Sequence, residues 1–150
     1  MTTEEVAKAA EAWAVAVIPE LHSYEHAPRS ILQAMPLVIA EVQRKEHQEL
    51  TVSESGFQQY SFQQTAVNVW NVDLLFLIDP SDAWTASQVL YNMTDTLGDA
   101  LDADPTLGQR VSFAASDYED SFDPPEFEYA DGTIVRVATM SIVVGEQKGA

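Results

Sequence analysis

The 150-residue sequence contains no cysteine, which excludes disulfide bonds, thiolate chemistry and cysteine-type zinc sites. It also lacks an apolar run long enough to cross a membrane, because Asn71 and Asp73 interrupt the longest one. The first residues are acidic and lack the basic region of a signal peptide. We therefore expect a protein that is made in the cytoplasm and has no membrane partner.

Positive charge is scarce in this chain. Lysine and arginine total 7 against 24 aspartate and glutamate residues, so the net charge is -17. No lysine or arginine lies between Lys45 and Arg110. Such a surface repels phosphate groups, which argues against a protein that binds nucleic acid or an anionic membrane. An acidic wall would still suit a protein along which DNA passes without sticking.

The sequence has no glycine-rich phosphate-binding loop and no nucleophile elbow, so we expect no enzyme activity and no cofactor. One segment, His22 to His26, has the H-x-x-E-H spacing of a metalloprotease class. That chemistry needs both histidines one turn apart on a helix, and a further ligand. Pro19 and Pro28 bracket the segment closely, which favours a pair of histidines without a metal. A small metal-dependent hydrolase that uses His22, Glu25 and His26 is the alternative from a different functional class.

A composition of 46% hydrophobic residues indicates one globular domain that spans residues 1–150. Helical periodicity predicts helices at about 3–17 and from Asp79 to Leu101. Thr2 and Glu5 fit a capping box at the start of the first helix. Alternating and β-branched segments predict strands over 36–44, 65–78, 111–115 and 133–144, with a short strand at 20–26. The predicted class is α+β: a mostly antiparallel sheet of four to five strands with two helices on one face.

The polar segment 45–64 predicts a long β-hairpin arm between two of these strands. Three aromatic residues lie among its glutamines: Phe57, Tyr60 and Phe62. Aromatic residues in a long polar loop favour contact with a partner, and the alternative is a mobile arm that makes no contact. The last residues, about 145–150, are predicted as a flexible tail.

The segment 116–125 is strongly acidic and predicts a solvated loop. Its acids are Asp117, Glu119, Asp120 and Asp123, and it also carries Tyr118 and Phe122. The residue spacing of a calcium-binding loop is absent, so a dedicated ion site is not favoured.

Two of the predicted strands are apolar on both faces. The apolar residues that point away from the helices are Val67, Val69, Leu75, Val135, Val137 and Val143. No predicted element covers them, and a monomer rarely exposes so many apolar residues together. A neighbouring copy is the economical cover, so we expect a homo-oligomer.

Segments spread over most of the chain share their order and type with one known family. They are the N-terminal helix, the strand start Pro36-Leu37-Val38-Ile39, the long hairpin, the strand end Leu74-Leu75-Phe76-Leu77-Ile78, the segment Leu97 to Gly108, and Tyr129-Ala130-Asp131-Gly132 before the last strand. In these features the chain resembles the tail-terminator (tail-completion) proteins of long, flexible-tailed bacteriophages. The stretch Asp104-Pro105-Thr106-Leu107-Gly108 is the one most typical of that family.

This resemblance implies a structural virion protein without enzyme activity, located in the neck region of the tail. Such proteins form a ring, expected to be a hexamer, on the head-proximal end of the tail tube. There they stop tube polymerisation and present a surface to the head connector. The implied partners are other copies, the tail-tube protein and the connector or stopper protein, while DNA passes through without specific binding. A connector adaptor, a head–tail stopper or the tail-tube subunit itself is the alternative within the same class.

The resemblance also guides where contacts are expected. The expected interface residues are Phe57, Tyr60, Phe62, Val67, Val69, Val135, Val137, Tyr118 and Phe122. The acids Asp117, Glu119, Asp120 and Asp123 are expected to face the lumen of the ring. The hairpin arm is the candidate for contact between one ring and the next.

Overall fold

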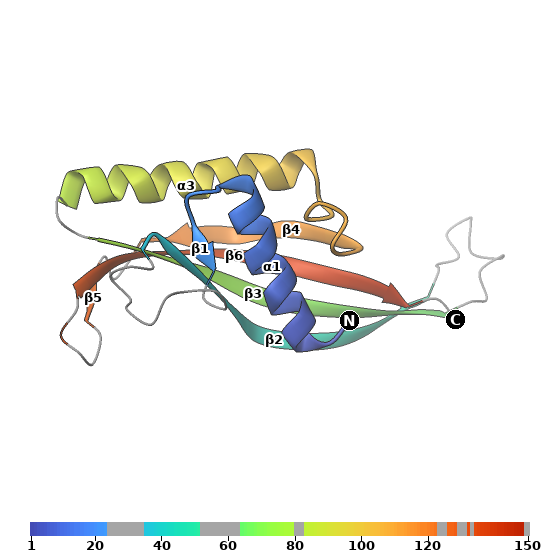
Figure 1. Ribbon diagram of the computed structural model, residues 1–150. Coiled ribbons are helices and arrows are strands. Elements are labelled where there is room, and N and C mark those ends of the chain that lie inside the picture. Colours follow the sequence, from blue (N-terminus) through green and yellow to red (C-terminus); the bar gives the residue numbers. More distant parts are fainter. Residues whose placement is uncertain are drawn as a thin grey trace.

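The computed structural model describes residues 1–23, 35–51, 64–79, 83–122, 126–128, 132 and 134–148. Figure 1 shows the helices packed against a sheet of long strands. The elements are α1 (Thr3–Val17), β1 (His22–Ser23), β2 (Leu37–Thr51), β3 (Gln64–Ile78), α3 (Ala83–Ala103), β4 (Phe113–Ser121), β5 (Glu126–Glu128) and β6 (Ile134–Lys148). Within the described residues, neither helix is long and apolar enough to cross a membrane.

The sheet has six strands in the order β1-β2-β3-β6-β4, and β5 pairs with β6 outside this path. β1 runs parallel to β2, and the other pairs are antiparallel. The predicted α+β class with a mostly antiparallel sheet is therefore confirmed. The short strand predicted at 20–26 corresponds to β1, and the strand number exceeds the predicted four to five by β5, a short strand that pairs with β6.

α1 begins and ends where the periodicity predicts. The side chain of Thr2 accepts a hydrogen bond from the Glu5 amide, and the Glu5 carboxylate accepts one from the Thr2 amide, which completes the capping box. The helix lies against β2 and β3. Its Glu11 carboxylate accepts a hydrogen bond from the Ala40 amide on β2, at 3.1 Å. This contact satisfies a main-chain donor of β2.

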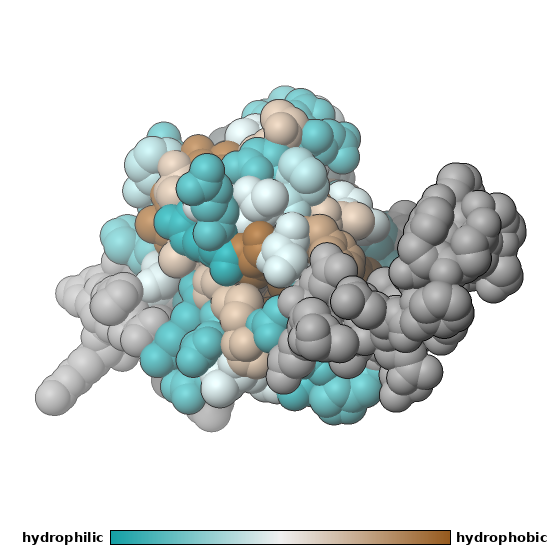
Figure 2. Space-filling view, turned by 90° about the vertical axis from the view of Figure 1, so that its right-hand side faces the viewer, coloured by the Kyte–Doolittle hydropathy of each residue, from teal (hydrophilic) through white to brown (hydrophobic). Residues whose placement is uncertain are grey.

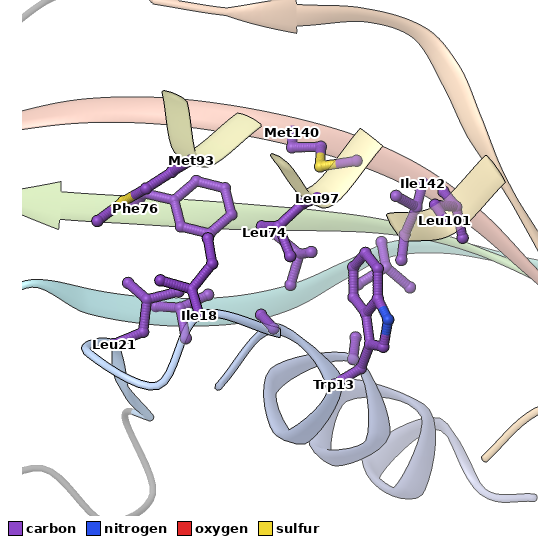
Figure 3. Packing of buried hydrophobic residues seen from close by; sticks show 14 of the residues in the cluster. Trp13, Ile18, Leu21, Leu74, Phe76, Met93, Leu97, Leu101, Met140 and Ile142 are labelled. Atoms are coloured by element: carbon purple, nitrogen blue, oxygen red, sulfur yellow. The ribbon is translucent and has the colours of Figure 1, made fainter. Parts of the chain in front are cut away.

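Both helices bury their apolar stripes on the same face of the sheet, as predicted. Figure 3 shows Trp13 of α1 and Met93 and Leu97 of α3 meeting Leu74 and Phe76 of β3 in one cluster. The sheet contributes alternate residues to this cluster: Trp70, Val72, Leu74, Phe76 and Ile78 from β3, and Ala138, Met140, Ile142 and Val144 from β6. The core thus lies between the helix layer and one side of a single sheet.

The strands are longer than predicted at the end of the sheet that carries the hairpin. β2 and β3 pair continuously from Leu37↔Leu77 to Thr51↔Gln64, apart from a bulge at Gln43. Residues 45–51, predicted as part of a hairpin arm, therefore belong to the main sheet. The tip of that hairpin, with Phe57, Tyr60 and Phe62, lies outside the described residues.

The end of the chain needs a similar correction. β6 runs through Lys148, which pairs with Ala66 of β3, although a flexible tail is predicted from residue 145. The extended β3 supplies partners for these last residues, and the local sequence gives no sign of that pairing. The predicted helix start at Asp79 and Pro80 stays a prediction, because residues 80–82 lie outside the description and α3 is described from Ala83.

Candidate interaction surfaces

The face of the sheet opposite the helices is closed at one end. Leu37, Leu77 and Val135 form a second buried cluster there, with exposures of 0%, 3% and 0%. Val135 was predicted to lie uncovered at an interface, and this expectation is wrong because the chain itself buries the residue. The register that sets Leu37 opposite Leu77, and Leu77 opposite Val137, gathers enough apolar side chains to form a core of their own.

The rest of this face, which we call the open face, has no described helix or strand packed over it. Its members are Ile39, Glu41, Val69, Asn71, Asp73, Leu75, Thr139, Ser141 and Val143, which alternate with the core residues of β2, β3 and β6. All but Glu41 are half-buried, as is Val137 beside the second cluster. Of the predicted interface residues, Val69 and Val137 thus lie on this side of the sheet. Val67 pairs in β3 with Gln147 of β6, but its side chain lies outside the description.

The middle of the open face carries two carboxylates side by side. Glu41 of β2 is the direct cross-strand neighbour of Asp73 of β3. The Ser141 hydroxyl of β6 donates a hydrogen bond to Asp73 Oδ1 at 2.7 Å. Like charges placed directly opposite each other destabilise a sheet. The nearest cation along β2, Arg44, pairs with Glu46 at 3.1 Å, so no described cation neutralises this carboxylate pair.

The acidic segment after Phe113 is a strand, which corrects the prediction of a solvated loop. β4 pairs with β6 from Phe113↔Gly145 to Ser116↔Ile142 and again at Asp120↔Met140, with a bulge between. A strand at the edge of a sheet tolerates charged residues well, because its side chains keep contact with water. β4 occupies this edge because it pairs with β6, which lies later in the chain. The composition of the acidic segment alone therefore predicts a loop.

Individual acids of β4 lie in different surroundings. Asp117 is half-buried, and Glu119 and Asp120 are exposed, while Asp123 lies outside the description. Partial desolvation and, secondarily, the carboxylate of Asp95 on α3 raise the pKa of Asp120. That these acids line a lumen remains a prediction.

The two aromatic residues predicted as contacts near this strand also differ. Phe122 packs against the main core and meets the ring of Tyr91 edge-on, with centroids 4.9 Å apart and an interplanar angle of 85°. Phe122 therefore helps to attach α3 to the sheet. Its place in an acidic segment gives no sign of this role. The side chain of Tyr118 lies outside the described residues.

The histidine segment does not begin as a helix. His22 lies in β1, exposed and paired in parallel with Leu37, whereas the metalloprotease geometry needs a helical turn. Glu25 and His26 lie outside the description. Among the residues that the structure describes, no group of three histidine, aspartate or glutamate side chains is placed to hold a metal.

The loop from α3 to β4, residues 104–112, is held together by side-chain hydrogen bonds. Asp104 Oδ1 accepts hydrogen bonds from the Thr106 amide and hydroxyl, at 3.1 and 2.5 Å, and Oδ2 accepts one from the Gly108 amide at 3.1 Å. The Thr106 hydroxyl in turn accepts a bond from the Gln109 amide at 2.9 Å. The hydrogen bonds that Asp104 accepts from Thr106 and Gly108 lower its pKa, and the bond from the Thr106 hydroxyl contributes most. Asp104 is thus the side chain that fixes the loop.

Three consecutive residues of this loop have left-handed backbone conformations. The φ angles are 51° at Leu107, 69° at Gly108 and 66° at Gln109. Each of the two non-glycine residues costs roughly 1–2 kcal/mol in this region. Leu107 offsets its strain because its side chain is fully buried in the main core. Backbone strain that the surrounding structure stabilises often marks a functional position. In the sequence, the segment Asp104 to Gly108 indicates this strained loop.

The loop presents one exposed arginine. Arg110 Nη1 donates a hydrogen bond to the Leu107 carbonyl at 3.0 Å, and a Cβ on Gly108 would lie 2.6 Å from the same nitrogen. Glycine therefore allows the guanidinium to fold back over the loop. The other described arginines, Arg44 and Arg136, each pair with a carboxylate, whereas Arg110 has no carboxylate partner among the described residues.

Comparison with protein-family models and with curated proteins finds no match for this chain. The functional argument therefore depends on the surfaces described above.

Phe113 adds an exposed ring close to Arg110 in sequence. Its side chain is 43% exposed and lies over Gly145 of β6, where a Cβ would come within 1.9 Å of the ring. Figure 1 places this loop at the end of α3 farthest from β5, and Figure 2 views the molecule from that end. There, hydrophilic residues surround small hydrophobic areas. An arginine and an aromatic ring on one short segment are residue types enriched at the centres of protein interfaces.

Two shallow grooves adjoin each other elsewhere, between α3 and the segments before β2. The larger is about 450 Å³ and the smaller about 200 Å³, and they share Pro36 and Val89. Their linings are mainly apolar and contain no cluster of titratable groups, so they carry no argument for catalysis.

Proposed function

We propose that this chain is a tail terminator of a long, flexible-tailed bacteriophage. In this role it forms a ring, expected to be a hexamer, on the head-proximal end of the tail tube. The ring stops tube polymerisation and joins the tail to the head connector. The proposal gives the protein a structural role in the virion neck and no catalytic one.

The observation that supports this proposal best is the one-sided layering of the fold. Both helices cover one face of the sheet, while Ile39, Leu75 and Val143 stay half-buried on the open face. Ile39 and Leu75 border the second cluster, and no described helix or strand lies over them. A domain normally buries each apolar sheet face against another layer. In a ring, the neighbouring subunit supplies that layer.

The charge of the chain supports the same role. A net charge of -17 repels DNA, which has to slide through the neck without being held. The resemblance in the order of segments, from the N-terminal helix to the last strand, is the reason for assigning this ring to the tail of a bacteriophage.

The proposal is tested on purified tail tubes that lack a terminator. We expect the added protein to cap one end of each tube in negative-stain images and to stop further growth from that end. Tubes that stay uncapped would contradict the proposal, and self-assembly of the protein into long tubes would identify it as the tube subunit. Binding to the connector without binding to the tube would identify a stopper or adaptor.

A matched pair of variants links capping to the open face. Thr139→Arg places a large side chain on the open face, beside Leu75 in the register. Gln88→Arg makes the same kind of change at an exposed position of α3. Both variants should keep the circular dichroism spectrum of the parent, and only Thr139→Arg should lose capping.

A further inference from the structure

We propose that Arg110 of one subunit binds the Glu41–Asp73 pair on the open face of a neighbouring copy of this chain. The inference rests on the proposed function for the existence of a ring, and it names the contact that closes the ring. It joins two surfaces that each lack a charge partner in the described part of one chain.

The donor side is a rigid cation. The hydrogen bonds of Asp104 and Thr106 fix the loop, and the Leu107 carbonyl holds the guanidinium at 3.0 Å. Little side-chain freedom is then lost when Arg110 binds a carboxylate, so the entropic cost of the contact is small. A planar guanidinium can also bridge two carboxylates that lie side by side.

The acceptor side is the pair of neighbouring carboxylates. Glu41 and Asp73 face each other across β2 and β3, and one hydroxyl, from Ser141, donates to Asp73. A cation between them removes their mutual repulsion. Ile39 and Leu75, which pair in the same two strands two residues away, offer an apolar surface beside the charges.

Charge complementarity selects a second copy as the occupant. A contact of two open faces with Glu41 and Asp73 overlaid would place four carboxylates together, which is strongly unfavourable in a chain of net charge -17. A contact between the α3–β4 loop and the open face joins two different surfaces. Such a head-to-tail contact repeats from copy to copy and closes into a ring when the rotation between copies completes a circle, whereas a self-complementary contact stops at a dimer.

Single cysteines test this contact cleanly, because the natural chain has none. Arg110→Cys and Glu41→Cys proteins are mixed and treated with a short bismaleimide cross-linker. We expect covalent dimers in the mixture, and a ladder up to the ring size when one chain carries both cysteines. A Lys8→Cys protein, altered on the exposed side of α1, mixed with Glu41→Cys gives the background. Cross-linking no higher than this background overturns the inference, and a double-cysteine protein that stops at the dimer overturns the head-to-tail arrangement.

Charge reversal provides the second readout. Arg110→Glu should weaken subunit association at least about tenfold in sedimentation experiments, as expected for loss of an interfacial charge pair. Asp73→Lys should weaken it similarly, and the two variants mixed should associate more tightly than either does alone. Lys8→Glu is the matched control and should associate as the parent does. If Arg110→Glu associates like the parent, the inference fails, whereas the proposed function fails only if the parent protein does not cap tail tubes.

Discussion

Replacing Gly145 with alanine tests the packing between β4 and β6 directly. The new Cβ would lie 1.9 Å from Phe113 Cζ and 2.3 Å from Cε2, so the ring has to leave β6. Phe113 is 43% exposed. A phenylalanine buries on the order of 200 Å² when it is fully covered, so about 110 Å² would return to water, which costs about 3 kcal/mol as an upper bound.

The gain from alanine is smaller than this cost. Alanine is favoured over glycine within a strand by roughly 0.5–1 kcal/mol. Because the ring can swing only part of the way, we expect Gly145→Ala to lower the free energy of unfolding by about 1–2 kcal/mol. Gly98 of α3 is the matched control, since a Cβ there meets no atom within 4 Å. Gly98→Ala should therefore stabilise the protein by about 1 kcal/mol.

The assay is urea unfolding of four proteins that form a double-mutant cycle: the parent, Gly145→Ala, Phe113→Ala and the double variant. In the Phe113→Ala background the clash is gone, so Gly145→Ala should become neutral or stabilising. The reasoning is refuted if Gly145→Ala stabilises the parent as Gly98→Ala does. It is also refuted if the effect of Gly145→Ala is the same with and without the Phe113 ring.

Three further predictions are read from melting temperatures, the first two over a pH series. The folded-state pKa of Asp104 is lowered. Its carboxylate therefore stabilises the fold above its unfolded pKa of about 3.9, and this stabilisation is lost as the pH falls through the folded pKa. Asp104→Asn should have a lower melting temperature at neutral pH and should lose this pH dependence. The pKa of Asp120 is raised, so the stability of the fold falls as the pH rises through the folded pKa. Asp120→Asn should therefore have a higher melting temperature at neutral pH. Glu119→Gln, at an exposed neighbouring position, is the control and should change the melting temperature little. Arg136→Ala removes the 3.0 Å bond to the buried Ser87 hydroxyl and should cost about 1–3 kcal/mol, and an unchanged melting temperature would contradict that role.

Local signals predict the helices and the core face well. Thr2 and Glu5 lie three residues apart and define the start of α1 by hydrogen bonds within one turn. On α3, the apolar residues at helical spacing, Ala86, Leu90, Met93, Leu97 and Leu101, are all buried. These features depend on residues close in sequence, so their pattern is visible before any tertiary contact is known.

The features that the sequence does not predict depend on distant partners. The segment Asp117 to Ser121 is composed like a loop, yet it forms an edge strand because β6 offers it a free edge. Val135 is buried because the pairings of Leu37 and Leu77 bring a second cluster together from three strands. The left-handed backbone at Leu107 and Gln109 is held by Asp104 and Thr106, and side-chain hydrogen bonds of this kind cannot be read from composition.

The division between local and distant signals also explains the outcome for the interaction surfaces. The alternation in β3 indicates two apolar faces, but it does not say how much of each face the chain itself covers. The structure closes the end at Leu77 and leaves the part around Asp73 and Leu75 as the open face. The predicted surface is thus smaller and more polar than the valine pattern suggests, and we propose that its charged centre selects the partner.

The most direct test of the central claim is a cryo-EM reconstruction of tail tubes capped with this protein. The account predicts one closed ring at the head-proximal end, with the open face of each subunit covered by its neighbour and Arg110 against Glu41 and Asp73. A capped tube in which the open face is exposed to solvent would contradict the claim that this face joins the subunits. A tube end without a ring of this protein would contradict the proposed function itself.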